Sequence, residues 1–290
     1  MNTKQLCIGL VFIKNMNIDT SVLCVNIHDD KILMEHLDEI CLDIVKKYPL
    51  FLKCIKNQTY KVCLEAVKRD GLALEFVDKQ TDEICFEAVK QDGYALEFVE
   101  KQTDELCLEA VKNDEFALKF VKEQTYELCS EAVKQYGSAL EYVKEQTQEL
   151  CMEAVKQNGL ALEYVGEQTP EICLEAVKQN GYALKYVAEQ TPEICAEAVE
   201  QYSYALEYVI SRTPELCLES VKRNGYALEF VKEQSPEICL GAVKESGMAL
   251  EYVVSQTPEL CMEAVKQNEN ALKYVKEEYK DYVREHLGEI

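Results

Sequence analysis

Cysteine is the residue of this sequence whose type and spacing most strongly suggest chemistry. The chain of 290 residues contains 14 cysteines, and ten of them recur every 22 residues. These ten are Cys63, Cys85, Cys107, Cys129, Cys151, Cys173, Cys195, Cys217, Cys239 and Cys261, and Cys41 continues the spacing towards the amino terminus. Regularly spaced thiols are candidates for disulfides, zinc ligation or redox buffering.

The spacing argues against disulfides and zinc. A disulfide needs Cα atoms within about 7 Å, whereas equivalent residues of stacked helices lie ~9–10 Å apart. Structural zinc sites usually take thiolates from close pairs such as C-x-x-C, and the cysteine ladder contains no such pair. In most repeats the cysteine follows a large aliphatic residue and precedes an alanine by three positions, as in Ile172, Cys173 and Ala176. We therefore predict small buried apolar groups, with no metal and no cofactor, and keep a thiol-rich metal or redox buffer as the weaker alternative.

Groups for acid–base or nucleophilic catalysis are few. The three histidines are His28, His36 and His286, all near the ends of the chain, and the sequence has no H-E-x-x-H, G-x-S-x-G or phosphate-loop pattern. Four departures from the repeat, at Glu115, Ser203, Ser220 and Gly241, bring no catalytic set with them. We expect a protein that is not an enzyme.

An aromatic ladder has the same period. Its members are Phe76, Phe98, Phe120, Tyr142, Tyr164, Tyr186, Tyr208, Phe230, Tyr252 and Tyr274. Because Phe and Tyr exchange freely, the favoured interpretation is packing between consecutive repeats, with a binding stripe as the alternative. Four residues earlier lies a more variable position, which is aromatic at Tyr94, Phe116, Tyr182, Tyr204 and Tyr226. Variation between repeats makes these five residues candidates for contact with a partner.

Acidic residues form a third ladder. Glu149 and Glu153, and likewise Glu171 and Glu175, are four residues apart and share one face of a helix. A lysine such as Lys178 is placed to pair with the second glutamate at i, i+3, so a solvated face is the default interpretation. The alternative is that these four glutamates contact a basic partner.

The element that positions all three ladders is a 22-residue repeat. We divide the chain into a divergent amino-terminal cap at 1–36, a repeat array at 37–278 and a carboxy-terminal capping helix at 279–290. The repeats begin at residues 37, 59, 81, 103, 125, 147, 169, 191, 213, 235 and 257. A unit this short cannot build its own core, so neighbouring units must stack and the ends need caps.

Each repeat is predicted to hold two short helices. In the repeat at 169–190, Thr169 is a good N-cap and Pro170 fits the first helical position. The pair Asn180-Gly181 divides the two helices, with the glycine either a left-handed helix stop or the start of the second helix.

Two other architectures have a related period. One continuous helix is disfavoured because five repeats carry an internal proline, which costs about 3 kcal/mol inside a helix. A leucine-rich repeat would need a strand with period-two alternation, which segments such as 172–174 fit poorly. The predicted fold class is therefore all-α, an α-solenoid of about eleven two-helix repeats with terminal caps.

Charge restricts the partners. The formal net charge is -22, from 53 acidic and 31 basic residues, which disfavours nucleic acid and anionic membranes and attracts a basic protein. No stretch approaches the ~20 apolar residues of a membrane span, and the first residues lack the pattern of a signal peptide. Together with the many free thiols, this predicts a reducing intracellular compartment.

The pattern [TS]-P-E-[IL]-C-L-E-A-V-K-x-N-G-Y-A-L-E-[FY]-V resembles the short helical repeats grouped as domain of unknown function 4116. The core from Glu175 to Tyr186 carries the resemblance, which covers about residues 37–290. That family is abundant in giant DNA viruses, so the resemblance implies a repeat fold, a viral protein in host cytoplasm or in the virion, and no catalytic residue. We expect a non-enzymatic scaffold for protein–protein interaction, with a structural or self-assembling role as the alternative and the oligomeric state open.

Overall fold

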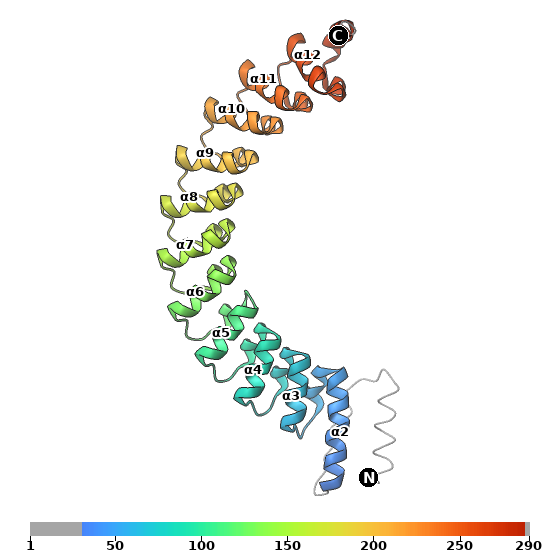
Figure 1. The fold of residues 1–290 in the computed structure, drawn as a ribbon, viewed down its shortest axis with the longest axis vertical. Helices are drawn as coiled ribbons and strands as arrows, with labels where there is room; N and C mark the ends of the chain where they lie inside the picture. Colours follow the sequence, from blue (N-terminus) through green and yellow to red (C-terminus); the bar gives the residue numbers. More distant parts are fainter. Residues whose placement is uncertain (1–30, 288–290) are drawn as a thin grey trace. The chain divides into compact units, whose positions relative to one another are not determined.

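A computed structural model describes residues 31–287, with the side chains of residues 38–286 (Figure 1). Residues 1–30 of the expected amino-terminal cap and residues 288–290 lie outside the described part of the chain. Every regular element from Lys31 to Leu287 is an α-helix or a 3-10 helix, and the two types alternate along the chain.

The α-helices are α2 (Lys31–Lys47), α3 (Tyr60–Arg69), α4 (Asp82–Gln91), α5 (Asp104–Asn113), α6 (Tyr126–Gln135), α7 (Gln148–Gln157), α8 (Pro170–Gln179), α9 (Pro192–Gln201), α10 (Pro214–Arg223), α11 (Pro236–Glu245), α12 (Pro258–Gln267) and α13 (Glu277–Leu287). The 3-10 helices are η2 (Pro49–Cys54), η3 (Gly71–Phe76), η4 (Gly93–Phe98), η5 (Ala117–Phe120), η6 (Gly137–Tyr142), η7 (Gly159–Tyr164), η8 (Gly181–Tyr186), η9 (Ser203–Tyr208), η10 (Gly225–Phe230), η11 (Gly247–Tyr252) and η12 (Glu269–Tyr274).

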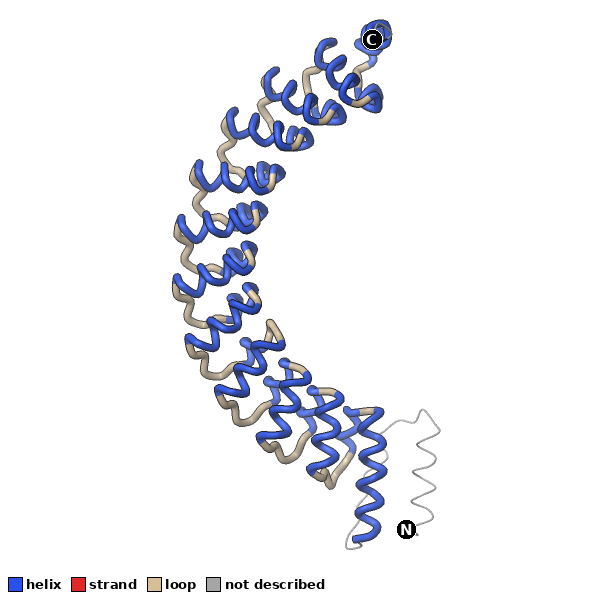
Figure 2. The backbone as a smooth tube through the Cα atoms, viewed as in Figure 1, coloured by secondary structure: helices blue, strands red, loops and turns tan. Residues whose placement is uncertain are grey.

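The described residues form two units, divided between Glu131 and Ala132 within α6. Within each unit, consecutive α-helices pack side by side and consecutive 3-10 helices form a second row, as α3 on α4 and η3 on η4 illustrate (Figure 2). Each unit is therefore a stretch of α-solenoid, which confirms the predicted all-α repeat fold. No helix in the described residues is both long and apolar enough to span a membrane.

The first helix of most repeats begins as its sequence predicts, although the Thr59 hydroxyl at the start of α3 makes no capping hydrogen bond. The Thr169 hydroxyl oxygen accepts a hydrogen bond from the Ile172 backbone N–H at 3.3 Å, which satisfies one donor of the first turn. Pro170 occupies the first turn, where no intrahelical acceptor waits for its missing N–H. The helix ends after ten residues at Asn180, whose own N–H bonds to the Ala176 carbonyl at 2.9 Å.

The second helix differs from the expectation, because it is a six-residue 3-10 helix instead of an α-helix. In η8 its hydrogen bonds span three residues, from the Ala183 N–H to the Asn180 carbonyl at 2.8 Å and from the Val187 N–H to the Leu184 carbonyl at 3.2 Å. The Asn180 side chain caps it by accepting from the Tyr182 N–H at 3.0 Å. One asparagine thus closes the first helix through its backbone and opens the second through its side chain.

The mid-repeat glycine starts the second helix and is not a left-handed stop. Gly181 is the first residue of η8, and none of the seven equivalent glycines has the positive φ of a left-handed residue. Glycine allows close packing on the following repeat: a Cβ on Gly137 would lie 2.5 Å from the Ala154 carbonyl oxygen, and one on Gly93 would lie 2.7 Å from that of Ala110. In the last repeat, which no further 22-residue repeat follows, the position holds Glu269.

Two departures from the repeat meet at one such contact. Ser203 replaces the glycine and Ser220 replaces the alanine that it would face. The Ser220 hydroxyl donates a hydrogen bond of 2.9 Å to the Ser203 carbonyl, so the buried hydroxyl is satisfied. In the repeat that holds Glu115, η5 begins two residues later than in its neighbours, at Ala117.

The core consists of the same positions in each repeat. In the repeat at 169–190 these are Ile172, Cys173, Ala176 and Val177 on α8, with Ala183 and Leu184 on η8, and none is more than 3% exposed. Leu272, the equivalent of Leu184 in the last repeat, is only half-buried, because a full repeat does not cover it. Burial between neighbours therefore supplies the stability of each repeat.

Replacing the repeat glycine by alanine tests this packing. We expect Gly159→Ala to lower the free energy of unfolding by about 3 kcal/mol, since the new Cβ strikes a backbone carbonyl that cannot move alone. Gly166→Ala is the matched control, because its Cβ meets nothing nearer than the Gln146 Oε1 at 3.6 Å and the next repeat carries Ala188 there. Urea unfolding of both variants measures the difference, and equal stabilities would contradict the close-packing account.

Candidate binding surface

A glutamine at the end of each repeat joins that repeat to the next. Gln168 donates from Nε2 to the Tyr186 carbonyl at 2.8 Å, and its Oε1 accepts from the Ala188 N–H at 3.0 Å and from the Cys173 thiol at 3.4 Å. The same three bonds recur at Gln58, Gln80, Gln102, Gln146, Gln190, Gln234 and Gln256. These inter-repeat glutamines fix the 3-10 helix of each repeat against its neighbour. Sequence reasoning missed them, although their invariance in nearly every repeat was the available signal.

Arg212 stands where this glutamine is expected between α9 and α10. Its guanidinium donates to the carbonyls of Leu206 at 2.9 Å and Glu207 at 2.7 Å, both within its own repeat. A guanidinium has no acceptor atom, so it cannot accept a hydrogen bond from the Cys217 thiol or from the backbone N–H of Lys232. Leu216 is correspondingly half-buried, whereas the equivalent Ile194 is 2% exposed.

The cysteine ladder is buried, as predicted from its neighbours. All ten members are at most 6% exposed, and no described cysteine is in a disulfide. Among the described residues, no three His, Cys, Asp or Glu side chains gather closely enough to hold a metal ion. Burial raises the pKa of the Cys173 thiol, and burial with the nearby Asp82 carboxylate raises that of Cys85 to about 11. The protonated thiol is therefore a hydrogen-bond donor to glutamine and a poor nucleophile.

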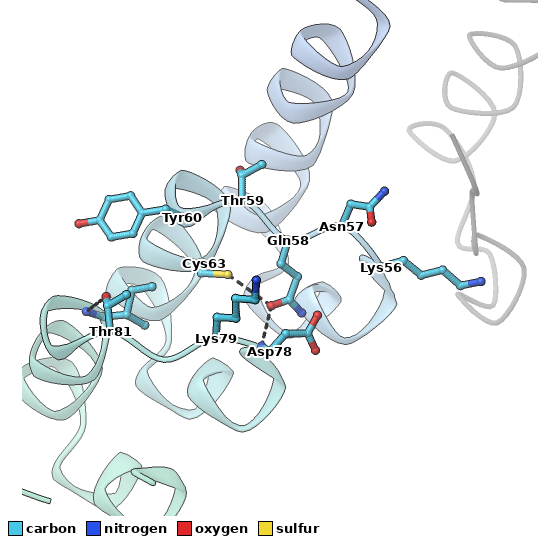
Figure 3. A pocket seen from close by; sticks show the side chains of 10 residues that line it. Lys56, Asn57, Gln58, Thr59, Tyr60, Cys63, Asp78, Lys79 and Thr81 are labelled. Atoms are coloured by element: carbon cyan, nitrogen blue, oxygen red, sulfur yellow. Dashed lines mark hydrogen bonds between the residues drawn. The ribbon is translucent and has the colours of Figure 1, made fainter. Parts of the chain in front are cut away.

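A pocket of about 460 Å³ lies beside the start of α3, in the first unit (Figure 3). Figure 3 shows Gln58 between Cys63 and Asp78, and its Oε1 accepts from the Cys63 thiol at 3.3 Å and the Asp78 N–H at 3.0 Å. Burial and then the Asp78 carboxylate raise the pKa of Cys63 to about 11. The thiol in this pocket is thus held in the unreactive protonated form, and Gln58 serves the contact between repeats. The Thr59 hydroxyl, which also lines the pocket, is buried without a hydrogen-bond partner among the described residues.

Aromatic rings form a row of contacting pairs across the 3-10 helices of the second unit, and Tyr202 links the first two pairs through its contacts with Tyr182 and Tyr204. Tyr182 meets Tyr208 with ring centroids 5.1 Å apart, Tyr204 meets Phe230 at 5.8 Å, and Tyr226 meets Tyr252 at 6.3 Å, all edge to face. Each pair joins the variable position of one repeat to the ladder position of the next, which confirms the predicted packing between repeats. The first unit has the same arrangement at Tyr94 and Phe120, 4.5 Å apart.

The rings remain accessible while they pack. The six rings of the row in the second unit are half-buried, and Tyr94 and Phe116 in the first unit are 38% and 45% exposed. Three of the five candidate aromatics, Tyr182, Tyr204 and Tyr226, therefore share one surface.

The structure does not bring the four candidate glutamates to this row, because they lie on α7 and α8. Hydrogen bonds from its own backbone N–H and from the Thr147 hydroxyl lower the pKa of Glu149, and Glu171 is bonded in the same way at its own N–H and Thr169. These two carboxylates act at the positive ends of their helices. Glu153 pairs with Lys134 of the preceding repeat at 3.5 Å, a contact between repeats where an i, i+3 pair within the helix was expected. Glu175 is half-buried on α8.

The acidic residues that accompany the rings are Glu207, Glu229 and Glu251 on η9, η10 and η11. Sequence reasoning missed them because it assumed α-helical spacing. In a 3-10 helix, side chains three residues apart eclipse, so this position lies over the variable aromatic position. Lys185 demonstrates the geometry, since its ammonium lies 5.7 Å from the centroid of the Tyr182 ring.

The fold and this surface define a helical repeat protein. A family model, the Domain of unknown function (DUF4116), matches at residues 60–103, 103–148, 126–168, 147–191, 169–212, 213–253 and 235–280. The chain belongs to this family, as its repeat core predicted. No curated protein and no solved structure is similar enough to match the chain.

Substitutions at the inter-repeat glutamine position test its role. We expect Arg212→Gln to raise the free energy of unfolding by about 1 kcal/mol, because it supplies the acceptor that Cys217 and residue 232 lack. Gln190→Ala should lower it by about 3 kcal/mol, since a carbonyl, an N–H and a thiol lose their partner. Arg212→Ala is the control that removes the guanidinium without adding an acceptor. Urea unfolding decides, and an Arg212→Gln variant no more stable than Arg212→Ala would contradict the account.

Thiol reactivity tests the burial of the cysteines. At pH 8 we expect Cys85, Cys173 and Cys261 to react with iodoacetamide at least about 100-fold more slowly in the folded protein than in urea, because they are buried and protonated. Since folding raises the Cys85 pKa from 9.0 to about 11, the stability that this thiol contributes is present below pH 9 and is lost as the pH rises towards 11. Peptide mapping by mass spectrometry measures the rates, and fast labelling of most ladder thiols in the folded protein would support a redox or metal buffer instead.

Proposed function

We propose that this chain is a non-enzymatic scaffold that binds another protein along the row of its 3-10 helices. The observation that carries the proposal is the aromatic row, whose rings contact one another in pairs across repeats and stay half-buried. Tyrosine rings held rigidly with one face accessible are the side chains that most often dominate binding at protein interfaces.

The repeat architecture supports a binding role. The inter-repeat glutamines and the glycine contacts hold each 3-10 helix against the next, so the rings are presented on a rigid support. A surface that repeats along the chain suits a long partner or several sites on one partner through avidity. Differences at the variable position, such as Met248 in place of Tyr226, would give each repeat its own preference.

The chemistry of the exposed groups supports a protein as the partner. A formal net charge of -22 repels the phosphates of nucleic acids and of anionic membrane surfaces, and accelerates association with a basic protein. The resemblance to repeats common in giant DNA viruses makes a host or viral protein the expected partner, within a reducing compartment such as the host cytoplasm. The protonated state of the buried thiols supports a role without catalysis.

Selection against the full chain tests the binding role. We expect immobilised protein to enrich ligands from a random-peptide display library, and the enriched peptides to bind saturably in solution at micromolar concentration. Tyr204→Ser with Tyr226→Ser should weaken binding about tenfold or more, because aromatic residues carry most interface energy. Tyr126→Ser is the control, because this exposed tyrosine lies on α6 and not on a 3-10 helix.

Size-exclusion chromatography with light scattering distinguishes a binding scaffold from the alternative, a structural or self-assembling protein. A monomer over a wide concentration range agrees with a scaffold for other proteins. Failure to enrich any peptide, together with concentration-dependent assembly of the chain, would overturn the proposal in favour of a structural, self-assembling protein.

A further inference from the structure

Three consecutive repeats of the second unit carry a strip in which carboxylates and aromatic rings alternate. The acidic aromatic strip consists of Glu207, Glu229 and Glu251 with Tyr204, Tyr226 and Tyr252, on η9, η10 and η11. The three carboxylates are exposed and the three rings are half-buried. Because residues i and i+3 share one side of a 3-10 helix, the positions of Glu207 and Tyr204 and those of Glu229 and Tyr226 are neighbours on the helix surface. A hydrogen bond with Tyr182 and, after it, one with Glu207 raise the pKa of Tyr208, so the Glu207 carboxylate lies beside the ring of the ladder position as well.

The chain's own lysines show what the ring faces accept. In the repeats that flank the strip, the position of these glutamates holds Lys185 and Lys273. The Lys185 ammonium lies 5.0 Å from the Tyr186 centroid, and the Lys273 ammonium lies 4.6 Å from the Tyr274 centroid. Both are cation–π distances. Within the strip the chain supplies carboxylates in place of these ammonium groups.

The carboxylates make the ring surface negative. Burial and then the charges of Glu229 and Glu251 raise the pKa of Tyr252, so carboxylates of two successive repeats act on one phenol. A cation placed there would meet an aromatic face and a carboxylate together, which is the pairing that the lysine or arginine of a partner can satisfy.

We propose that the acidic aromatic strip binds an extended basic segment of another protein, with one lysine or arginine seated in each repeat. The inference rests on the proposed scaffold function and specifies its partner. Packed helices lie ~9–10 Å apart, and an extended chain in the polyproline II conformation advances ~3.1 Å per residue with three residues per turn, so every third side chain points to the same side. A matching segment therefore carries a basic residue at about every third position. Lys185 and Lys273 mark the two ends of the strip, because a basic partner would be repelled there.

Fluorescence anisotropy with a labelled synthetic peptide tests the strip in the full chain. The probe has about twelve residues with arginine at every third position and proline and serine between, which favours the polyproline II conformation, and the comparison peptide has the same composition with its arginines contiguous. We expect the spaced peptide to bind about tenfold more tightly at physiological ionic strength, because only its cations reach all three repeats.

Charge-matched variants separate the strip from general acidity. Glu207→Gln, Glu229→Gln and Glu251→Gln combined should weaken binding of the spaced peptide about tenfold or more. Glu167→Gln, Glu189→Gln and Glu233→Gln combined remove the same charge from exposed loop positions of the same unit and should weaken it less than about threefold. Lys185→Glu adds a fourth carboxylate and should tighten binding. Circular dichroism melting checks that each variant is folded.

Two results would overturn the inference. Equal losses in the two triple variants, or equal affinity for the spaced and contiguous peptides, would assign the binding to net charge alone. A dimer that dissociates when the strip glutamates are replaced would assign the surface to a second copy of the chain. If library peptides still bind while the spaced peptide does not, only this inference fails; if no peptide binds, the scaffold function fails with it.

Discussion

The side-chain amide that ends each repeat is the interaction on which the rest of this structure depends. The amide oxygen accepts hydrogen bonds from a thiol and a backbone N–H of the following repeat, and the amide nitrogen donates one to a backbone carbonyl there. Gln168 makes these bonds with Cys173, Ala188 and Tyr186. The end of a 3-10 helix exposes backbone groups that no regular ladder satisfies, and the neighbour's glutamine supplies their partners. Repeats that are too short to fold alone are thus joined by directed bonds as well as by apolar burial.

This arrangement explains why cysteine recurs. The position must be small and apolar enough to pack between neighbouring helices, and it must also donate one hydrogen bond to the glutamine oxygen. A protonated thiol meets both demands, and burial keeps it protonated by raising its pKa. The residue that first suggested metal or redox chemistry is therefore part of the packing.

The surface that remains for binding is the outer side of the 3-10 helices. Their inner residues, such as Ala183 and Leu184, are fully buried, and their termini are held by asparagine caps and inter-repeat glutamines. The rings at the variable position can therefore differ between repeats in one property, which is the charge of the side chain beside them. Lysine or glutamate three residues later sets that charge repeat by repeat, as Lys185 and Glu207 do.

The sequence by itself determined the period, the repeat boundaries, the threonine and proline at the start of each first helix and the burial of the cysteines, because local capping and apolar spacing carry that information. Only the tertiary structure decided that the second helix is 3-10, that the repeat glycine packs against a carbonyl of the next repeat, and that Glu207 lies on the same 3-10 helix as the rings while Glu149 and Glu171 serve their own helix ends. These outcomes depend on how one repeat lies against its neighbour. A short segment such as Gly181–Tyr186 has too few local bonds to choose between helix types, so the neighbouring repeat makes that choice.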